Sequence, residues 1–145
     1  MCGCRTRHSN GARYLQLEDG GFAYTARSQK SALPRSAAAI TARVRFDPAR
    51  QDRLQQGLKY LHANTTPGAT RDVYLYYRQY YLATALRDAE DQHFVRWYPP
   101  MSEKLIATYT AEGGWDSSLG DGYAAGNSVV ALRSPLQRVI RVKNP

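Results

Sequence analysis

The sequence predicts an all-α protein made of helical hairpins, and three observations support this fold class. Apolar residues recur at spacings of three and four along several segments, as on one face of an amphipathic helix. Glycine, proline and acidic residues separate these segments at short intervals. Alternation of period two, which is typical of a strand, is limited to residues 138–142, where no hairpin partner is evident.

Length and composition favour one domain. The chain has 145 residues, of which 43% are hydrophobic and 11% aromatic, so it can bury a core. Residues 1–12 are polar, contain glycine and lack periodicity, and we expect a disordered lead-in there. The repeat domain is then expected to span residues 13–145.

Two helices are expected in the first half of this domain. The run SAAAITARV from Ser36 favours a helix, with Pro34 suited to its first turn and Pro48 behind its end. Asp47 is expected to cap the next helix. That helix carries leucines at helical spacing and should end in the turn at 64–68.

Three further helices are expected in the second half. The segment 71–89 has one broad apolar face, formed by Val73, Tyr77, Tyr80, Tyr81, Thr84 and Ala85. The proline pair at 99–100 is expected to open the next helix, with Gly113 and Gly114 closing it. The last helix should run over 123–133, before Pro135.

Two similar motifs suggest an internal repeat. Residues 16–24 and 110–116 each combine an acidic turn with a glycine pair and an aromatic residue. Phe22 and Trp115 lie 93 positions apart, which accommodates two helical hairpins with a boundary near Pro67 and Gly68. We expect the glycines to allow a tight reversal while the aromatic ring packs over helix ends. The structural residues of these turns are Gln16, Gly20, Gly21, Phe22, Gly113, Gly114 and Trp115.

These motifs resemble the repeat of the squalene cyclase and prenyltransferase family, in which Gln and an acidic turn precede Gly-x-Trp. The first copy matches at Gln16, Asp19 and Gly20, with Phe22 in place of Trp. The second copy matches at Glu112, Gly113 and Trp115, with Tyr109 in place of Gln. The stretches YLYYRQYYLATAL and FVRWYPPMSEKL add to the likeness, which covers residues 14–142. It implies an α/α-toroid, here as an incomplete ring of two to three repeats.

The catalytic groups of that family are not expected in this chain. The nearest match to its Asp-x-Asp-Asp acid is the segment 88–91, where Glu90 replaces an aspartate and a helix-to-helix turn would leave the carboxylates solvated. The only cysteines, Cys2 and Cys4, are too few for a zinc site, and His62 and His93 are interpreted as lone histidines at the surface or at helix ends. We therefore expect no catalytic residue, no metal ligand and no cofactor.

Tyr77, Tyr80 and Tyr81 allow two interpretations. On an amphipathic helix they would share the face that packs the core, with their hydroxyls at its rim. Tyrosine rings in cyclases also line the cavity and stabilise carbocations through their π faces. These three residues are therefore the candidate cavity-lining residues for an isoprenoid ligand.

The charge of +8 raises the question of nucleic acid, but the arginines are spread along the chain and favour a solvated surface, so nucleic-acid binding is not expected. No apolar stretch is long enough to cross a bilayer, and a cytoplasmic location is expected. The leading hypothesis is a non-catalytic repeat module that engages a partner protein or the missing repeats. The alternatives are a remnant or subunit of an isoprenoid-processing enzyme, and a basic nucleic-acid-binding protein.

Overall fold

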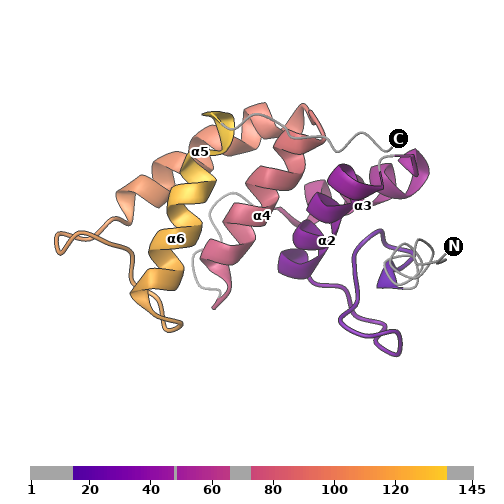
Figure 1. Ribbon diagram of the computed structural model, residues 1–145, viewed down its shortest axis with the longest axis horizontal. Helices are drawn as coiled ribbons and strands as arrows, with labels where there is room; N and C mark the ends of the chain where they lie inside the picture. Colours follow the sequence, from indigo (N-terminus) through magenta and orange to yellow (C-terminus); the bar gives the residue numbers. More distant parts are fainter. Residues whose placement is uncertain (1–14, 48, 66–72, 137–145) are drawn as a thin grey trace, which may run out of the picture.

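The described part of the computed structural model, residues 15–47, 49–65 and 73–136, is helical (Figure 1). Its β-structure is limited to the isolated bridges Gln16 to Phe22 and Ala23 to Ser31, so the all-α prediction is confirmed there. The expected lead-in, the boundary at Pro67 and Gly68 and the alternating stretch 138–142 lie outside these residues. The elements are α2 (Leu33–Phe46), α3 (Gln51–Asn64), α4 (Leu75–Asp88), α5 (His93–Ala107), α6 (Asp121–Leu132) and the 3₁₀ turn η1 (Ser134–Leu136).

Helices α2, α4 and α6 run parallel to one another, with α4 in the middle (Figure 1). Near the amino-terminal ends of α4 and α6, the amide of Tyr77 donates to the hydroxyl of Tyr123 at 3.3 Å. Near their carboxyl-terminal ends, Arg87 of α4 donates to the carbonyl of Ser134, just after α6, at 3.1 Å. On the other side of α4, its carboxyl-terminal Asp88 pairs with Arg45 of α2. Matching ends therefore meet on both sides of α4.

Helices α3 and α5 form a second layer, which packs against the layer of α2, α4 and α6. Gly57 of α3 lies against the side chain of Ile40 of α2, and the hydroxyl of Tyr98 of α5 donates to the carbonyl of Leu132 of α6 at 2.6 Å. The rings of His62 and His93 stack where α3 and α5 meet. The helices thus alternate between two layers along the chain.

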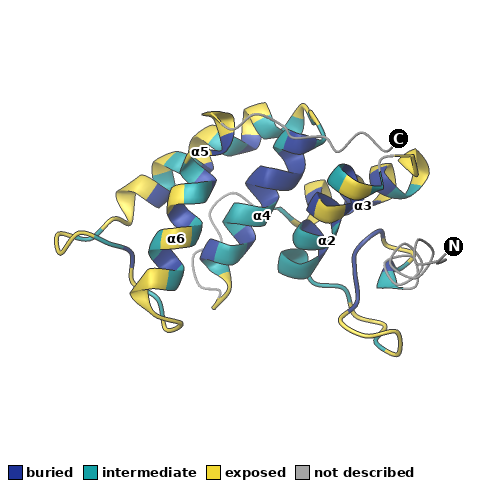
Figure 2. Cartoon of the chain, in the orientation of Figure 1, coloured by how far each residue is buried: buried dark blue, intermediate teal, exposed yellow. Residues whose placement is uncertain are grey.

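The core lies around α4, whose buried residues lie between the neighbouring helices (Figure 2). The most deeply buried large side chains have at most 1% of their surface exposed: Ile40, Leu61, Leu82 and Leu86. Burying a leucine or isoleucine side chain contributes about 1.5 to 3 kcal/mol to stability, so this cluster is a main source of folding free energy.

The prediction of one apolar face on the helix at 71–89 is partly wrong. The helix begins at Leu75, and Val73 lies before it, with 54% of its surface exposed. Thr84 and Ala85 are buried as expected, but the face also includes Tyr76, Leu82, Ala83 and Leu86. The reason is that α4 packs against α2 on one side and α6 on the other, so its buried surface is wider than one amphipathic stripe.

The proline pair does not open a helix, which corrects the sequence prediction. Pro99 and Pro100 lie inside α5, which is continuous from His93 to Ala107 and ends before Gly113. A proline at these positions leaves the carbonyls of Val95 and Arg96 without an intrahelical donor. Both of those residues are exposed, as are the prolines, so water can hydrate the carbonyls and the helix continues.

The first two helices follow the prediction more closely. Helix α2 begins at Leu33 with Pro34 in its first turn, and Leu54, Leu58 and Leu61 are buried on α3. Asp47 does not cap α3, because Arg50 occupies the cap position without a side-chain bond. The carboxylate of Asp47 instead lies 3.6 Å from the guanidinium of Arg50. Helix α6 covers 121–132, within two residues of the expected range.

Candidate functional site

The first corner, residues 16–22, reverses the chain before α2. The amide of Leu17 donates to the carbonyl of Gly21 at 2.8 Å, and the amide of Gly20 donates to the carbonyl of Leu17 at 3.0 Å. The carboxylate of Asp19 accepts from the amide of Gly21 at 2.8 Å and from the hydroxyl of Ser31 at 2.7 Å. Asp19 therefore fixes the turn from two directions.

Both glycines of the first corner are required by their surroundings. Gly20 has φ +86°, and a Cβ there would lie 2.2 Å from the carbonyl oxygen of Gln56 of α3. At Gly21 a Cβ would lie 2.5 Å from Ser31 and 2.7 Å from the ring of Tyr60. A side chain at either position collides with groups already in place. Helix α3 therefore covers this corner at van der Waals distance.

Gln16 connects the first corner to α3 directly. Its Nε2 donates to the carbonyl of Gly20 at 3.1 Å and to the carbonyl of Arg53 of α3 at 2.9 Å. Its Oε1 is buried with no partner among the described residues. Gln16 therefore acts through its amide nitrogen, as a donor bridging two backbone carbonyls.

Phe22 attaches the first corner to α2. Its amide donates to the hydroxyl of Ser36 at 2.8 Å, and its ring, 3% exposed, lies 5.6 Å from the guanidinium carbon of Arg43. Burial lowers the pKa of Arg43, a shift that Asp47 opposes. The face of an aromatic ring attracts a cation, so Phe22 is part of the environment that holds this buried charge.

The second corner, residues 109–115, has the same backbone hydrogen bonds at positions 93 residues later. The amide of Thr110 donates to the carbonyl of Gly114 at 2.8 Å, and the amide of Gly113 donates to the carbonyl of Thr110 at 3.1 Å. Gly113 has φ +93°, close to the φ of Gly20. Trp115, 7% exposed, occupies the position of Phe22, and its indole nitrogen donates to the carbonyl of Leu105 at 2.7 Å.

The two corners differ in what surrounds them. Tyr109, in the position of Gln16, is 52% exposed, whereas Gln16 is 8% exposed. Its ring meets the ring of Trp115 edge to face, with centroids 4.9 Å apart. A Cβ on Gly114 would meet no atom of the described residues within 4 Å, and one on Gly113 would meet only the hydroxyl of Tyr109 at 3.6 Å. Among the described residues, no helix covers the second corner as α3 covers the first.

Tyr77, Tyr80 and Tyr81 are half-buried on α4. The ring of Tyr81 lies 4.5 Å from each of the other two rings, and burial is the main cause of a raised pKa at Tyr77. The sequence interpretation missed Tyr76, which is 8% exposed and donates from its hydroxyl to the carbonyl of Asp116 at 2.9 Å. This bond ties α4 to the residue that directly follows the second corner. No local signal singles out Tyr76 from the other tyrosines of this helix.

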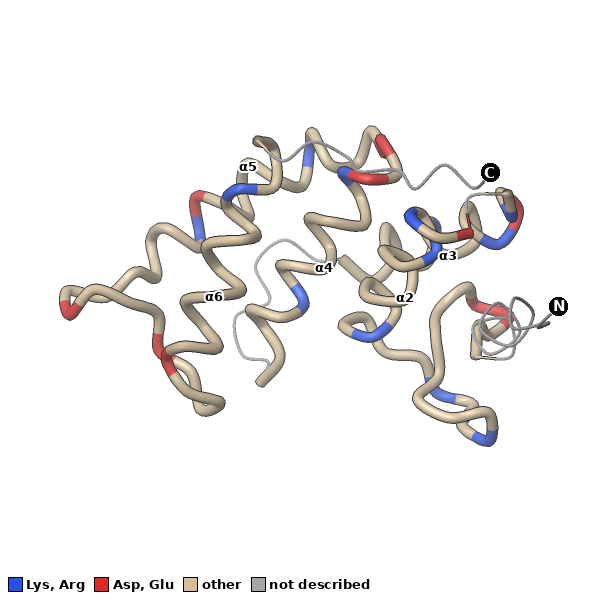
Figure 3. Tube along the Cα trace, in the orientation of Figure 1, with Lys and Arg blue, Asp and Glu red and all other residues tan. Residues whose placement is uncertain are grey.

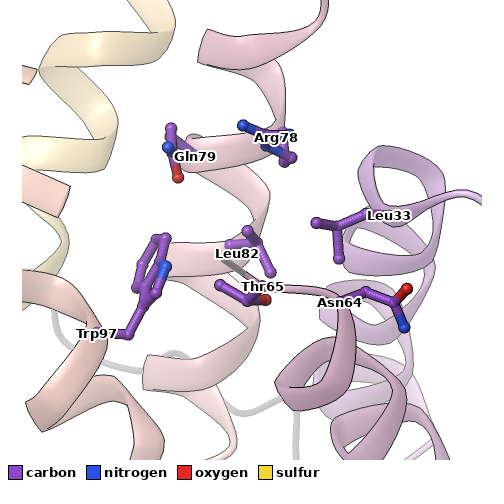
Figure 4. Close-up of a pocket in the computed structure, with 7 residues that line it drawn as sticks. All are labelled: Leu33, Asn64, Thr65, Arg78, Gln79, Leu82 and Trp97. Carbon is purple, nitrogen blue, oxygen red and sulfur yellow. The ribbon is translucent and has the colours of Figure 1, made fainter. Parts of the chain in front are cut away.

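A small pocket lies between α4 and the ends of α2, α3 and α5, and the three candidate tyrosines are not among its lining residues (Figure 4). Its volume is about 40 Å³, room for a few water molecules rather than a prenyl chain. Gln79 contributes a buried Oε1 with no partner among the described residues. The lining residues are Leu33, Asn64, Thr65, Arg78, Gln79, Leu82 and Trp97.

The expected solvation of the acidic segment 88–91 is wrong for Asp88. This residue is completely buried at the end of α4, where its carboxylate binds the guanidinium groups of Arg45, at 2.6 Å, and Arg87. A buried carboxylate needs such partners, because it would otherwise lose its hydration without compensation. Glu90 is exposed, in agreement with a turn.

His62 and His93 lie at helix ends, as expected, in the last turn of α3 and at the start of α5, but they are not lone histidines. Their rings stack with centroids 4.4 Å apart, and Nε2 of His62 lies 3.0 Å from the carboxylate of Asp91. Asp91 also accepts from the amide of His93 at 2.7 Å. Burial, followed by the neighbouring His62, lowers the pKa of His93, and Asp91 opposes this shift. The cluster joins α3 to α5.

The described residues contain no group of three or more metal-ligating side chains with suitable geometry. None of the helices in this part of the chain has both the length and the apolar character of a membrane span. Cys2 and Cys4 lie outside the described residues. Comparisons with protein-family models, with curated proteins and with solved structures gave no match.

Proposed function

We propose that this chain is a non-catalytic repeat module of the α/α-toroid type, an incomplete ring that works by binding a partner protein or further repeats. One observation carries this proposal: two corners with the same backbone bonds lie 93 residues apart, and among the described residues a helix covers only the first. In repeat proteins each unit packs against its neighbours, so a unit without one exposes the surface that its neighbour would bury.

The alternation of helices between two layers supports the repeat interpretation. Successive helical hairpins place every second helix in the same layer, as α2, α4 and α6 are placed here. Apolar side chains remain accessible at the end of the molecule that carries the second corner. They include Ile106, Tyr109 and Leu119, each between 45% and 60% exposed. Exposed apolar surface of this kind is typical of interaction sites.

The burial and the hydrogen bonds of Asp88 support a non-catalytic role. A class II cyclase acid must hold a proton that it can give to its substrate. Both carboxylate oxygens of Asp88 instead accept from arginine side chains, and the residue has no exposed surface. This arrangement suits a structural ion pair.

Light scattering after size-exclusion chromatography tests the proposal. In a pure sample the exposed apolar end has only other copies to contact, so we expect the average mass to exceed that of the monomer and to rise with protein concentration. A hydrophobic dye should bind in proportion to the monomer that remains. A mass equal to that of the monomer at all concentrations, with no dye binding, would contradict the proposal.

A role in an isoprenoid-processing enzyme is the second candidate, and the tyrosines of α4 favour it. The rings of Tyr77, Tyr80 and Tyr81 are half-buried and clustered on one helix, so each keeps part of its surface accessible to a ligand. Titration with farnesyl diphosphate or squalene, monitored through the tyrosine ring resonances, tests this candidate. Unchanged resonances would contradict it.

Nucleic-acid binding gains no support, because Lys and Arg are scattered over several helices rather than gathered on one (Figure 3).

A further inference from the structure

The second corner lies in a stretch whose charge is opposite to that of the whole chain. From Leu105 to Leu132 the sequence has three carboxylates and no lysine or arginine, although the net charge of the protein is +8. The three acidic residues Glu112, Asp116 and Asp121 are all exposed, and this end of the molecule is marked by acidic positions (Figure 3). A surface of this kind attracts a positively charged partner.

The first corner shows what kind of element such a corner holds. Helix α3 passes close enough for its backbone at Gln56 to fill the space where Gly20 would carry a Cβ. The ring of Tyr60 covers Gly21, and Gly57 allows α3 to approach the side chain of Ile40. The docked helix thus presents a glycine and, three residues later, a tyrosine on one face.

Within the described structure, no close contact explains why residue 114 is glycine. Gly113 is explained by its positive φ, but no positive φ is found at Gly114 and the space around its missing Cβ is open. At the equivalent position of the first corner, glycine is needed because Tyr60 lies against it. A helix docked on the second corner would give Gly114 the same role.

Tyr109 and Trp115 of the second corner also fit the docking of a helix. Gln16 holds α3 by donating to the backbone carbonyl of Arg53. Tyr109 stands in its place with 52% of its surface exposed, and its hydroxyl can donate to a carbonyl in the same way. Trp115 already lies underneath, with its ring against that of Tyr109. The buried Trp115 supports the exposed ring of Tyr109, which offers the apolar contact to a docked helix.

We infer that the second corner is a docking site for a basic amphipathic helix of a partner protein, one that presents glycine and, three residues on, an aromatic residue. This inference rests on the proposed function and names its binding site. The glycines give close approach, Tyr109 supplies a donor to the helix backbone, and the three carboxylates select positive charge.

A peptide with the sequence of α3, residues 51–64, is the probe that tests the site, since this is the helix that the first corner accepts. Added to the full-length chain, it should shift the amide resonances of Gly113 and Gly114 while those of Gly20 and Gly21 stay unchanged. Binding should weaken as salt is added, because the attraction between exposed charges is screened.

The variant Gly114→Leu fills the open space that the docked helix would occupy. It should weaken binding at least about tenfold, the effect expected when a side chain overpacks a close contact. Gly126→Leu is the matched control, because Gly126 is equally open but lies on α6, and the affinity of this variant should stay within about twofold. A peptide with Gly57→Val tests the same contact from the other side, and it leaves the folding of the protein untouched.

The inference would be overturned by no shift at either corner at millimolar peptide, or by shifts confined to Gly20 and Gly21. Equal affinity for Gly114→Leu and the unaltered chain would do the same. If the mass still rises with concentration in light scattering while the peptide does not bind, the docking site is wrong and the proposed function stands. If the mass never rises but the peptide binds the second corner, the docking site stands and association between copies of the chain is excluded.

Discussion

The first and second corners have the same backbone and different environments. Gly20 and Gly113 share a positive φ, and the two turns close with hydrogen bonds that agree within 0.1 Å. A helix covers the first corner, whereas the described residues leave the second one open. A turn of this type therefore forms from its own residues, and its cover is a separate contribution. Mutations at equivalent positions can measure that contribution.

The largest difference is expected between Gly20→Ala and Gly113→Ala. Both variants place a side chain at positive φ, which costs about 1 to 2 kcal/mol. Only Gly20→Ala also drives a Cβ into the backbone carbonyl of Gln56, so its total loss should reach about 4 kcal/mol. Chemical denaturation of the two variants measures both values. Equal losses would show that α3 does not restrain the first corner.

A smaller difference is expected between Gly21→Ala and Gly114→Ala. The new Cβ at position 21 meets the side chains of Ser31 and Tyr60, which can shift, so the loss should be about 1 to 3 kcal/mol. At position 114 the space is open, and the change should stay within about 0.5 kcal/mol. Thermal melting of each variant checks the pair. A large loss for Gly114→Ala would mean that the second corner is already covered.

The donor at the start of each corner gives the next comparison. Gln16→Leu leaves the carbonyls of Gly20 and Arg53 without this donor, and we expect a loss of about 1 to 2 kcal/mol. Tyr109→Leu removes an edge-to-face contact with Trp115 on an exposed side chain, for a loss of about 0.5 to 1 kcal/mol. Urea titrations at one pH compare them, and a reversed order would contradict the bridging role of Gln16.

The smallest effect is a pH dependence of the helix that covers the first corner. The folded pKa of His93 lies below the ordinary value of 6.5, so the unfolded chain binds more protons in the interval between them. Stability is therefore complete above about pH 6.5 and falls as the pH drops towards the folded pKa. The protection factors of the α3 amides against exchange should fall over that window. His93→Gln should remove the dependence, and its persistence would point to another group.

The sequence predicted the elements that depend on local pattern and missed those that depend on distant partners. The leucines of α3 and the proline at the start of α2 act within one helix, so spacing alone located them. The burial of Asp88 depends on Arg45, which lies 43 positions away. The pairing of His62 with His93 likewise requires α3 and α5 to meet. Whether a corner is covered is also a property of the assembled helices.

Parallel helices side by side align their macrodipoles, which gathers partial negative charge at their carboxyl-terminal ends. Basic residues stand at each of these ends in the parallel layer: Arg43 and Arg45 in α2, Arg87 in α4 and Arg133 after α6. Asp88 neutralises one of these charges, and the remaining cations offset the summed dipoles, whose mutual repulsion would otherwise oppose parallel packing. Part of the net charge of +8 is therefore a requirement of the helix arrangement itself. Replacing these arginines would disturb the fold before it affected any encounter with a polyanion.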